Sequence, residues 1–87
     1  MTYTVLFTRQ ADKDLGRISP PDRTRIIRKA MRLAHDPRPK GVKKLIGEED
    51  LYRIRIGDYR VVYEILDRIV TVTVVRIRHR RDAYKGL

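Results

Sequence analysis

The sequence predicts an α+β fold: a small antiparallel β-sheet with two N-terminal helices packed on one face, in the order β-α-α-β-β-β. Three observations lead to this prediction. Apolar residues alternate with polar ones in residues 2–8, recur at helical spacing in residues 9–36, and alternate again in three runs between residues 52 and 77. The chain has 87 residues and no internal repeat or linker, so we expect residues 1–87 to form a single domain.

Two helices are expected to follow the first strand. Residues 9–18 carry apolar side chains at helical spacing and predict a short helix. The stronger helix runs from Ser19 to Asp36, because Ser19 is a favourable N-cap and Pro20 suits the first helical position. Pro37 ends this helix. Its apolar stripe comprises Ile26, Ile27, Ala30, Leu33 and Ala34.

Three strands linked by hairpins are expected to complete the sheet. A connecting segment, residues 36–50, leads into them, with Leu45 as its apolar anchor. Gly57–Asp58 fits a two-residue turn with glycine first, and Asp67–Arg68 is predicted as a second two-residue turn. With these turns, one sheet face comprises Tyr52, Ile54, Ile56, Val61, Tyr63, Ile65, Val70, Val72 and Val74.

The opposite face of the predicted sheet gathers arginines. Arg53 and Arg55 point away from the apolar face, and a two-residue turn places Arg55 directly opposite Arg60. Like charges in opposite positions destabilise a strand pair, by about 0.2–1 kcal/mol. We interpret the patch as a site for a strongly negative group such as an RNA phosphate. The alternative is a solvated basic face in a generally basic protein.

The charge balance favours a polyanionic partner. There are 21 Lys and Arg against 11 Asp and Glu, a formal net charge of +10, and such a field attracts nucleic acid or acidic protein. Cysteine is absent and the only histidines are His35 and His79, so neither a metal site nor a cofactor is expected. No apolar run is long enough to span a bilayer, and no signal-peptide core begins the chain. We therefore expect a cytoplasmic protein without a membrane partner.

The C-terminal segment adds further basic and aromatic residues. "RIRHRRDAYKGL", residues 76–87, contains Arg78, His79, Arg80, Arg81 and Tyr84. A tyrosine among arginines suits RNA, because a base stacks on the ring while guanidinium groups hold phosphates. Two alternatives stay open: the tyrosine packs on the sheet, and the histidine is an ordinary surface residue.

Two motifs carry a family resemblance. "LYRIRIGDYRVVYEI" and "IRHRRDAY", with "KKLIGEEDLYRI" leading into the first, resemble the RelE toxin family of bacterial and archaeal toxin–antitoxin pairs, within the RelE/ParE superfamily. The resemblance covers nearly the whole chain. It implies an mRNA endonuclease that cuts the codon in the ribosomal A site and is inhibited by a cognate, RelB-like antitoxin. Together with the charge, it predicts that the antitoxin binds through an acidic segment.

The resemblance also implies which residues form the site: Arg53, Arg55, Arg60, Arg80 and Tyr84. In this family the basic residues on the strand before the Gly-Asp turn are often lysines, whereas here both are arginines. Arginine stays protonated in proteins, so these two are expected to stabilise charge rather than accept protons.

Metal-free cleavage of RNA also needs a proton acceptor and a proton donor. Histidine is the side chain that titrates nearest to neutral pH, which makes His79 the candidate for this role. Four further basic residues are expected to bind RNA: Arg78, Arg81, Lys43 and Lys44. Two other functions stay open from the sequence, a ParE-like inhibitor of DNA gyrase and a non-catalytic RNA- or ribosome-binding module.

Overall fold

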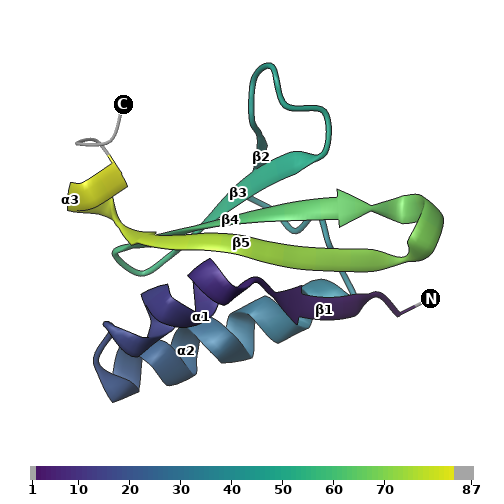
Figure 1. The fold of residues 1–87 in the computed structure, drawn as a ribbon. Helices are drawn as coiled ribbons and strands as arrows, with labels where there is room; N and C mark the ends of the chain where they lie inside the picture. Colours follow the sequence, from purple (N-terminus) through teal and green to yellow (C-terminus); the bar gives the residue numbers. More distant parts are fainter. Residues whose placement is uncertain (1, 84–87) are drawn as a thin grey trace.

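The computed structural model describes residues 2–83 and confirms the α+β fold, with two helices against a mostly antiparallel sheet (Figure 1). No helix in this range is long and apolar enough to cross a membrane. The elements in chain order are β1 (Thr4–Phe7), α1 (Arg9–Gly16), α2 (Pro20–Met31), the 3₁₀ turn η1 (Arg32–Ala34), β2 (Lys43–Lys44), β3 (Leu51–Ile56), β4 (Tyr59–Leu66), the 3₁₀ turn η2 (Asp67–Ile69), β5 (Thr71–His79) and α3 (Arg80–Ala83).

The sheet has five strands in the order β1-β5-β4-β3-β2. All neighbouring pairs are antiparallel except β1 and β5, which run parallel. The predicted antiparallel sheet is therefore confirmed for β2 to β5, while β1 runs parallel because it pairs with a strand more than 60 residues away. The fifth strand, β2, lies in the segment that the sequence predicted as a connection.

The two N-terminal helices start where the sequence favours it and end earlier than expected. Thr8 caps α1, because its hydroxyl accepts a hydrogen bond of 3.1 Å from the Ala11 N–H. Pro20 opens α2 as predicted, although the Ser19 side chain makes no capping bond to the backbone. The regular helix ends at Met31 and tightens into η1, so the predicted end at Asp36 was too late.

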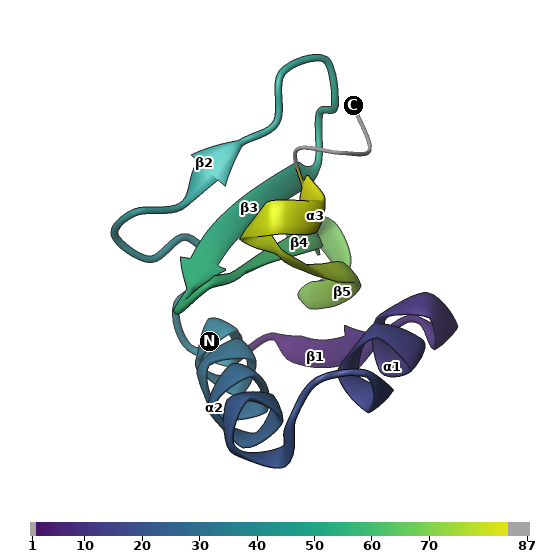
Figure 2. The same cartoon turned by 90° about the vertical axis from the view of Figure 1, so that its left-hand side faces the viewer.

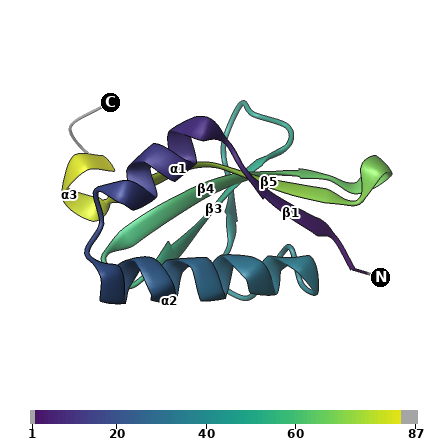
Figure 3. The ribbon, with the colours of Figure 1, turned by 60° about the horizontal axis from the view of Figure 1, so that its bottom comes forward.

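The core lies between these helices and one face of the sheet, here called the core face (Figures 2 and 3). Tyr63 is fully buried within it, and its hydroxyl donates a 2.8 Å hydrogen bond to the Pro37 carbonyl. The core comprises Ala11, Leu15, Ile18, Ile26, Ala30 and Leu33 from the helical half, and Ile56, Val61, Tyr63, Ile65, Val72, Val74 and Ile77 from the sheet.

One of the two predicted turns is confirmed. Ile56 pairs with Tyr59, so Gly57–Asp58 forms a two-residue turn, and Gly57 has the positive φ of 60° that such turns require. At the other turn Leu66 pairs with Thr71, so the loop spans four residues, 67–70, rather than two. The two extra residues preserve which strand residues face the core, but they leave Val70 in the loop with φ 51° instead of on the core face.

A β-bulge in β5 changes the alternation of that strand. Val62 pairs with Arg76 and Tyr63 pairs with Val74, so Val75 has no partner on β4. Val74 before the bulge and Ile77 after it are both buried, although they are three positions apart. Strict alternation would have placed Arg78 in the core, whereas the bulge places it on the opposite face of the sheet.

The β4–β5 loop is held to the segment after α2 by a polar cluster, here called the Arg38 clasp: Tyr3, Arg38, Tyr52 and Asp67. Arg38 donates two hydrogen bonds to the Asp67 carboxylate, at 2.8 and 3.2 Å, and its guanidinium lies 5.1 Å from the centre of the Tyr52 ring. The hydrogen bond from Arg38, and then that from Tyr3, hold the pKa of Asp67 below its usual range.

Candidate nucleic-acid interface

The sheet face opposite the core, here called the arginine face, carries Arg53, Arg55, Arg60 and Arg78. Arg55 pairs directly with Arg60, as predicted, and Arg60 pairs in turn with Arg78 on β5. Three guanidinium-bearing residues therefore lie side by side across β3, β4 and β5. Like charges in neighbouring positions repel, which raises the energy of the folded chain.

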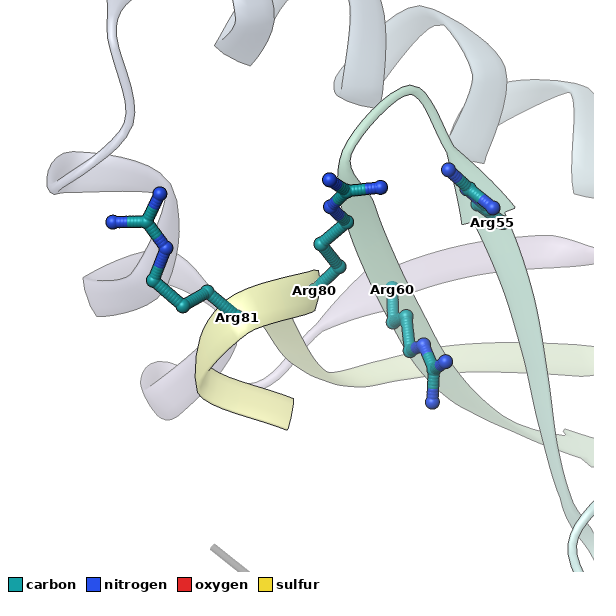
Figure 4. Close-up of a pocket in the computed structure, with 4 residues that line it drawn as sticks. All are labelled: Arg55, Arg60, Arg80 and Arg81. Carbon is teal, nitrogen blue, oxygen red and sulfur yellow. The ribbon is translucent and has the colours of Figure 1, made fainter. Parts of the chain in front are cut away.

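A pocket of about 340 Å³ opens at this end of the sheet, lined by Arg55, Arg60, Arg80 and Arg81. Figure 4 shows that these side chains come from three elements, with Arg55 on β3, Arg60 on β4 and the other two on α3. Arg80 extends toward the strand pair, while Arg81 extends from the other side of the helix. We call this cavity the α3 pocket.

A second pocket, here called the β2 pocket, has a volume of about 280 Å³. It shares Arg55 and Arg60 with the α3 pocket, so the two cavities adjoin across these two side chains. Lys43 enters it because β2 pairs Lys43 with Arg53, which puts both residues on the arginine face. Its lining residues are Gly41, Lys43, Arg53, Ile54, Arg55 and Arg60.

The turn between β3 and β4 organises the α3 pocket. The Arg55 Nε donates a 3.0 Å hydrogen bond to the Gly57 carbonyl, which limits where its guanidinium can lie. The Arg80 backbone N–H donates a 2.7 Å hydrogen bond to the Asp58 carbonyl, which ties the first residue of α3 to the same turn. The Arg55 side chain and the Arg80 backbone are thus both hydrogen-bonded to the same two-residue turn.

Among residues 2–81, whose side chains are described, no Asp or Glu lines either pocket. Three ion pairs lie outside the pockets and join Arg25 to Asp22, Arg38 to Asp67, and Arg76 to Asp14. Glu64 lies on the arginine face but four residues along β4 from Arg60, which is about 13 Å in a strand.

Several predicted site residues lie elsewhere. His79 pairs with Tyr59 and follows Ile77 by two positions, which places it on the core side of the sheet, away from the arginine face. Its ring contacts Tyr59 edge to face, at 5.3 Å between centroids, and its Nδ1 accepts a hydrogen bond from the Arg81 N–H. Lys44 pairs with Tyr52 and also faces away. Tyr84 lies outside the described residues.

Two features of the site were not anticipated from sequence. One is α3, a single helical turn that brings Arg80 and Arg81 over the end of the sheet. The other is the bulge that turns Arg78 toward Arg60. A signal for the bulge was present in "TVTVVRI", where apolar residues at 72 and 74 are followed by apolar residues at 75 and 77.

The arrangement suits a chain of phosphates better than a single small ligand. Two adjoining cationic pockets that share a ridge of guanidinium groups can hold successive negative charges along a backbone. Planar guanidinium groups donate paired hydrogen bonds that match phosphate oxygens. Since arginine remains protonated, the pockets supply charge and hydrogen-bond donors rather than a proton acceptor.

Comparisons with known proteins identify the family of the chain. Residues 5–84 match the profile of a family described as the ParE toxin of the type II toxin–antitoxin system parDE. The chain is similar to putative toxin RelE1 of Methanocaldococcus jannaschii, with 33% identity over 99% of both chains. It is also similar to mRNA interferase toxin RelE of Escherichia coli, with 30% identity over 97% of this chain and 92% of that one.

The fold matches solved structures as well. A chain of the RelBE2 toxin–antitoxin complex from Mycobacterium tuberculosis superimposes with a TM-score of 0.82 and 33% identity, over 92% of this chain and all of that one. A chain of the archaeal RelE–RelB complex from Pyrococcus horikoshii superimposes with a TM-score of 0.81 and 32% identity, over 92% and 97% of the two chains.

Proposed function

We propose that this chain, which belongs to the RelE-type toxins of the type II toxin–antitoxin systems, is an endoribonuclease that cuts mRNA in the ribosomal A site. The observation that carries the proposal is the pair of adjoining pockets lined by Arg55 and Arg60, which offer concentrated positive charge on an open sheet face. The relative named as an mRNA interferase supports the same activity.

The proposed reaction is attack of a ribose 2′-oxygen on the adjacent phosphorus, without a metal ion. A bond forms between O2′ and phosphorus, the bond from phosphorus to O5′ breaks, and the products carry a 2′,3′-cyclic phosphate and a 5′-hydroxyl. The crowded phosphate gains negative charge in the transition state, and Arg53, Arg55 and Arg60 stabilise it electrostatically. Arg80 supports the departing 5′-oxygen, and Tyr84 stacks on a base.

The proposed site accounts less well for proton transfer than for stabilisation of charge. The 2′-hydroxyl must lose a proton and the 5′-oxygen must gain one. His79, the sequence-based candidate, lies on the core side of the sheet and caps the backbone of α3 instead of facing the arginines. We therefore propose that the ribosome contributes by holding the mRNA in a conformation already close to that of the reaction.

We further propose a cognate antitoxin that binds through an acidic segment and places its carboxylates against the arginine face. The structural relatives from M. tuberculosis and P. horikoshii are toxin–antitoxin complexes, which supports a partner of this kind. Action on ribosomes also places the toxin in the cytoplasm.

The decisive experiment maps mRNA ends in a reconstituted translation reaction. Purified toxin is added to ribosomes stalled on a defined codon, and new 5′ ends are captured by adapter ligation with and without prior treatment by a polynucleotide kinase. The proposal predicts new ends within the A-site codon that ligate only after kinase treatment, because they carry 5′-hydroxyls. Ribosome association without new ends would identify a non-catalytic binding module instead.

Inhibition of DNA gyrase is the second candidate function, because the description of the matching family names the toxin ParE. A supercoiling assay with purified gyrase, run beside the translation reaction at the same toxin concentration, separates the two functions. Loss of supercoiling with intact mRNA would replace the nuclease proposal.

A further inference from the structure

The buried carboxylate of Asp14 lies on α1, and Asp14 is not among the residues that line either pocket. It is 7% exposed and is the only buried charged residue among residues 2–81, for which burial is described. Its Oδ2 accepts a 2.9 Å hydrogen bond from the Ile77 backbone N–H and a 3.1 Å bond from the Arg76 Nε, while Oδ1 accepts a bond from the Gln10 amide. Burying a charge is costly, so its presence here calls for a reason beyond packing.

The place at which Asp14 contacts β5 suggests why a buried carboxylate is needed there. β1 pairs with β5 only as far as Val74, and beyond that point α1 lies against the edge that β1 leaves uncovered. The Thr8 hydroxyl donates to the Val75 carbonyl, and Asp14 accepts from the Ile77 N–H. These two side chains, from α1 and its N-cap, therefore bind the edge of β5 at the bulge residue itself and two residues beyond it.

The bulge in turn determines which residues reach the arginine face. With Val75 looped out, Ile77 enters the core and Arg78 pairs with Arg60. Two residues later, the Arg80 N–H meets the Asp58 carbonyl and α3 begins. A one-residue slip in this register would turn Arg78 toward the core and displace the first residue of α3 from the turn.

We propose that Asp14 is a positioning residue for the arginine site: by binding the Ile77 N–H it locks the register of β5 after the bulge, and so aims Arg78, Arg80 and Arg81. This inference rests on the proposed RNA-binding function of that face. It differs from a purely stabilising role because it predicts a changed site in a molecule that is still folded.

The test uses full-length protein and three variants. Asp14→Ala removes the acceptor, and Asp14→Asn keeps an oxygen for the Ile77 N–H while removing the charge. Ile26→Val is the matched control, because it removes one methyl group from the core and leaves every hydrogen bond on the edge of β5 in place. Two properties are measured: amide hydrogen exchange at Ile77 and Arg80, and the salt dependence of binding to a single-stranded RNA analogue that lacks 2′-hydroxyls.

We expect Asp14→Ala to speed exchange at Ile77 and Arg80 by about tenfold or more relative to core amides. The slope of log affinity against log salt should become shallower by roughly 0.7 to 1.4, which corresponds to one or two lost phosphate contacts. Asp14→Asn and Ile26→Val should keep the wild-type slope. If Asp14→Ala binds the RNA analogue with the wild-type slope and keeps Arg80 protected, Asp14 only stabilises the fold and the proposal is wrong.

If Asp14→Ala does not fold at 10 °C, Asp14→Glu takes its place, because it keeps the carboxylate but displaces it by one methylene from the Ile77 N–H. The same two measurements, amide hydrogen exchange and the salt dependence of binding, then test the proposal. Neither measurement depends on cleavage, so absence of mRNA cleavage by the wild-type protein would refute the nuclease proposal alone. A wild-type slope near zero would show that the face does not bind RNA, whereas the exchange data would still test the register.

Discussion

Arginines at the two ends of the sheet have different surroundings. In the Arg38 clasp, one guanidinium has a carboxylate and two tyrosines around it, and it joins the segment after α2 to the β4–β5 loop. In the α3 pocket, four guanidinium-bearing residues from three elements line one cavity. The first arrangement is complete within the protein.

This difference distinguishes an arginine that joins two segments of the fold from arginines that line a cavity. A paired arginine on the surface adds modestly to stability and has little charge left to offer. Arginines gathered around one cavity repel one another, and a bound anion would relieve that repulsion. The two ends of the sheet should therefore respond differently to the same kind of substitution.

The largest effect is expected from Arg60→Ala. It removes a guanidinium shared by both pockets, so mRNA cleavage in the translation reaction should fall about 100- to 1,000-fold, the usual loss for one donor to a developing charge. The melting temperature should fall by no more than a few degrees, since the residue lies on the solvent side of the sheet. Wild-type cleavage by the folded variant would remove the pockets from the mechanism.

The matched substitution at the other end, Arg38→Ala, provides the control. It removes one guanidinium and the same net charge, but from the clasp, so cleavage measured well below the melting temperature should stay within about twofold of wild type. Equal losses of cleavage in the two variants would show that net charge matters and that the pockets have no special role.

The antitoxin is expected to show a smaller but clear dependence on salt. An acidic segment drawn to the arginine face should associate at least tenfold faster at about 10 mM than at about 150 mM salt, because the Debye length shortens from roughly 30 to 8 Å. Stopped-flow mixing with the product of the neighbouring gene provides the measurement. A rate independent of salt would indicate that the antitoxin recognises another surface.

Tyr63→Phe is expected to lower the free energy of unfolding by about 1 kcal/mol. The Tyr63 hydroxyl donates to the Pro37 carbonyl, and burial raises the pKa of Tyr63, as expected for a phenol inside the core. Loss of the bond should destabilise the fold by about 1 kcal/mol, or about 4–8 °C in melting temperature for a domain of this size. Cleavage at low temperature should not change, and a decrease would couple the core to the site.

The smallest effect concerns acid stability. The pKa of Asp67 is lower in the folded chain than in the unfolded chain, so the unfolded chain binds more protons between the two values. The Arg38 clasp therefore contributes fully to the stability of the fold above about pH 4, and this contribution is lost as pH falls through the pKa of Asp67 in the folded chain. Urea unfolding between pH 2 and 6 should show a steeper acid decline for wild type than for Asp67→Asn, and parallel curves would exclude the clasp as a source.

Much of this site was determined by sequence over short distances. The two-residue turn at Gly57–Asp58 fixes its own strand pairing, so the position of Arg55 opposite Arg60 followed from counting residues. The start of α2 at Pro20 and the positive charge of the chain are likewise local or compositional properties. In each case the deciding interactions lie within a few residues of one another.

The tertiary structure decided the remainder, because it depends on contacts between residues far apart in the chain. The bulge that turns Arg78 toward Arg60 is held by Asp14, 63 residues away from Ile77. The parallel pairing of β1, the core-side location of His79 and the docking of α3 on the Asp58 carbonyl are of the same kind. A local pattern specifies which faces a strand has, but only its neighbours in space determine its register and which face meets the core.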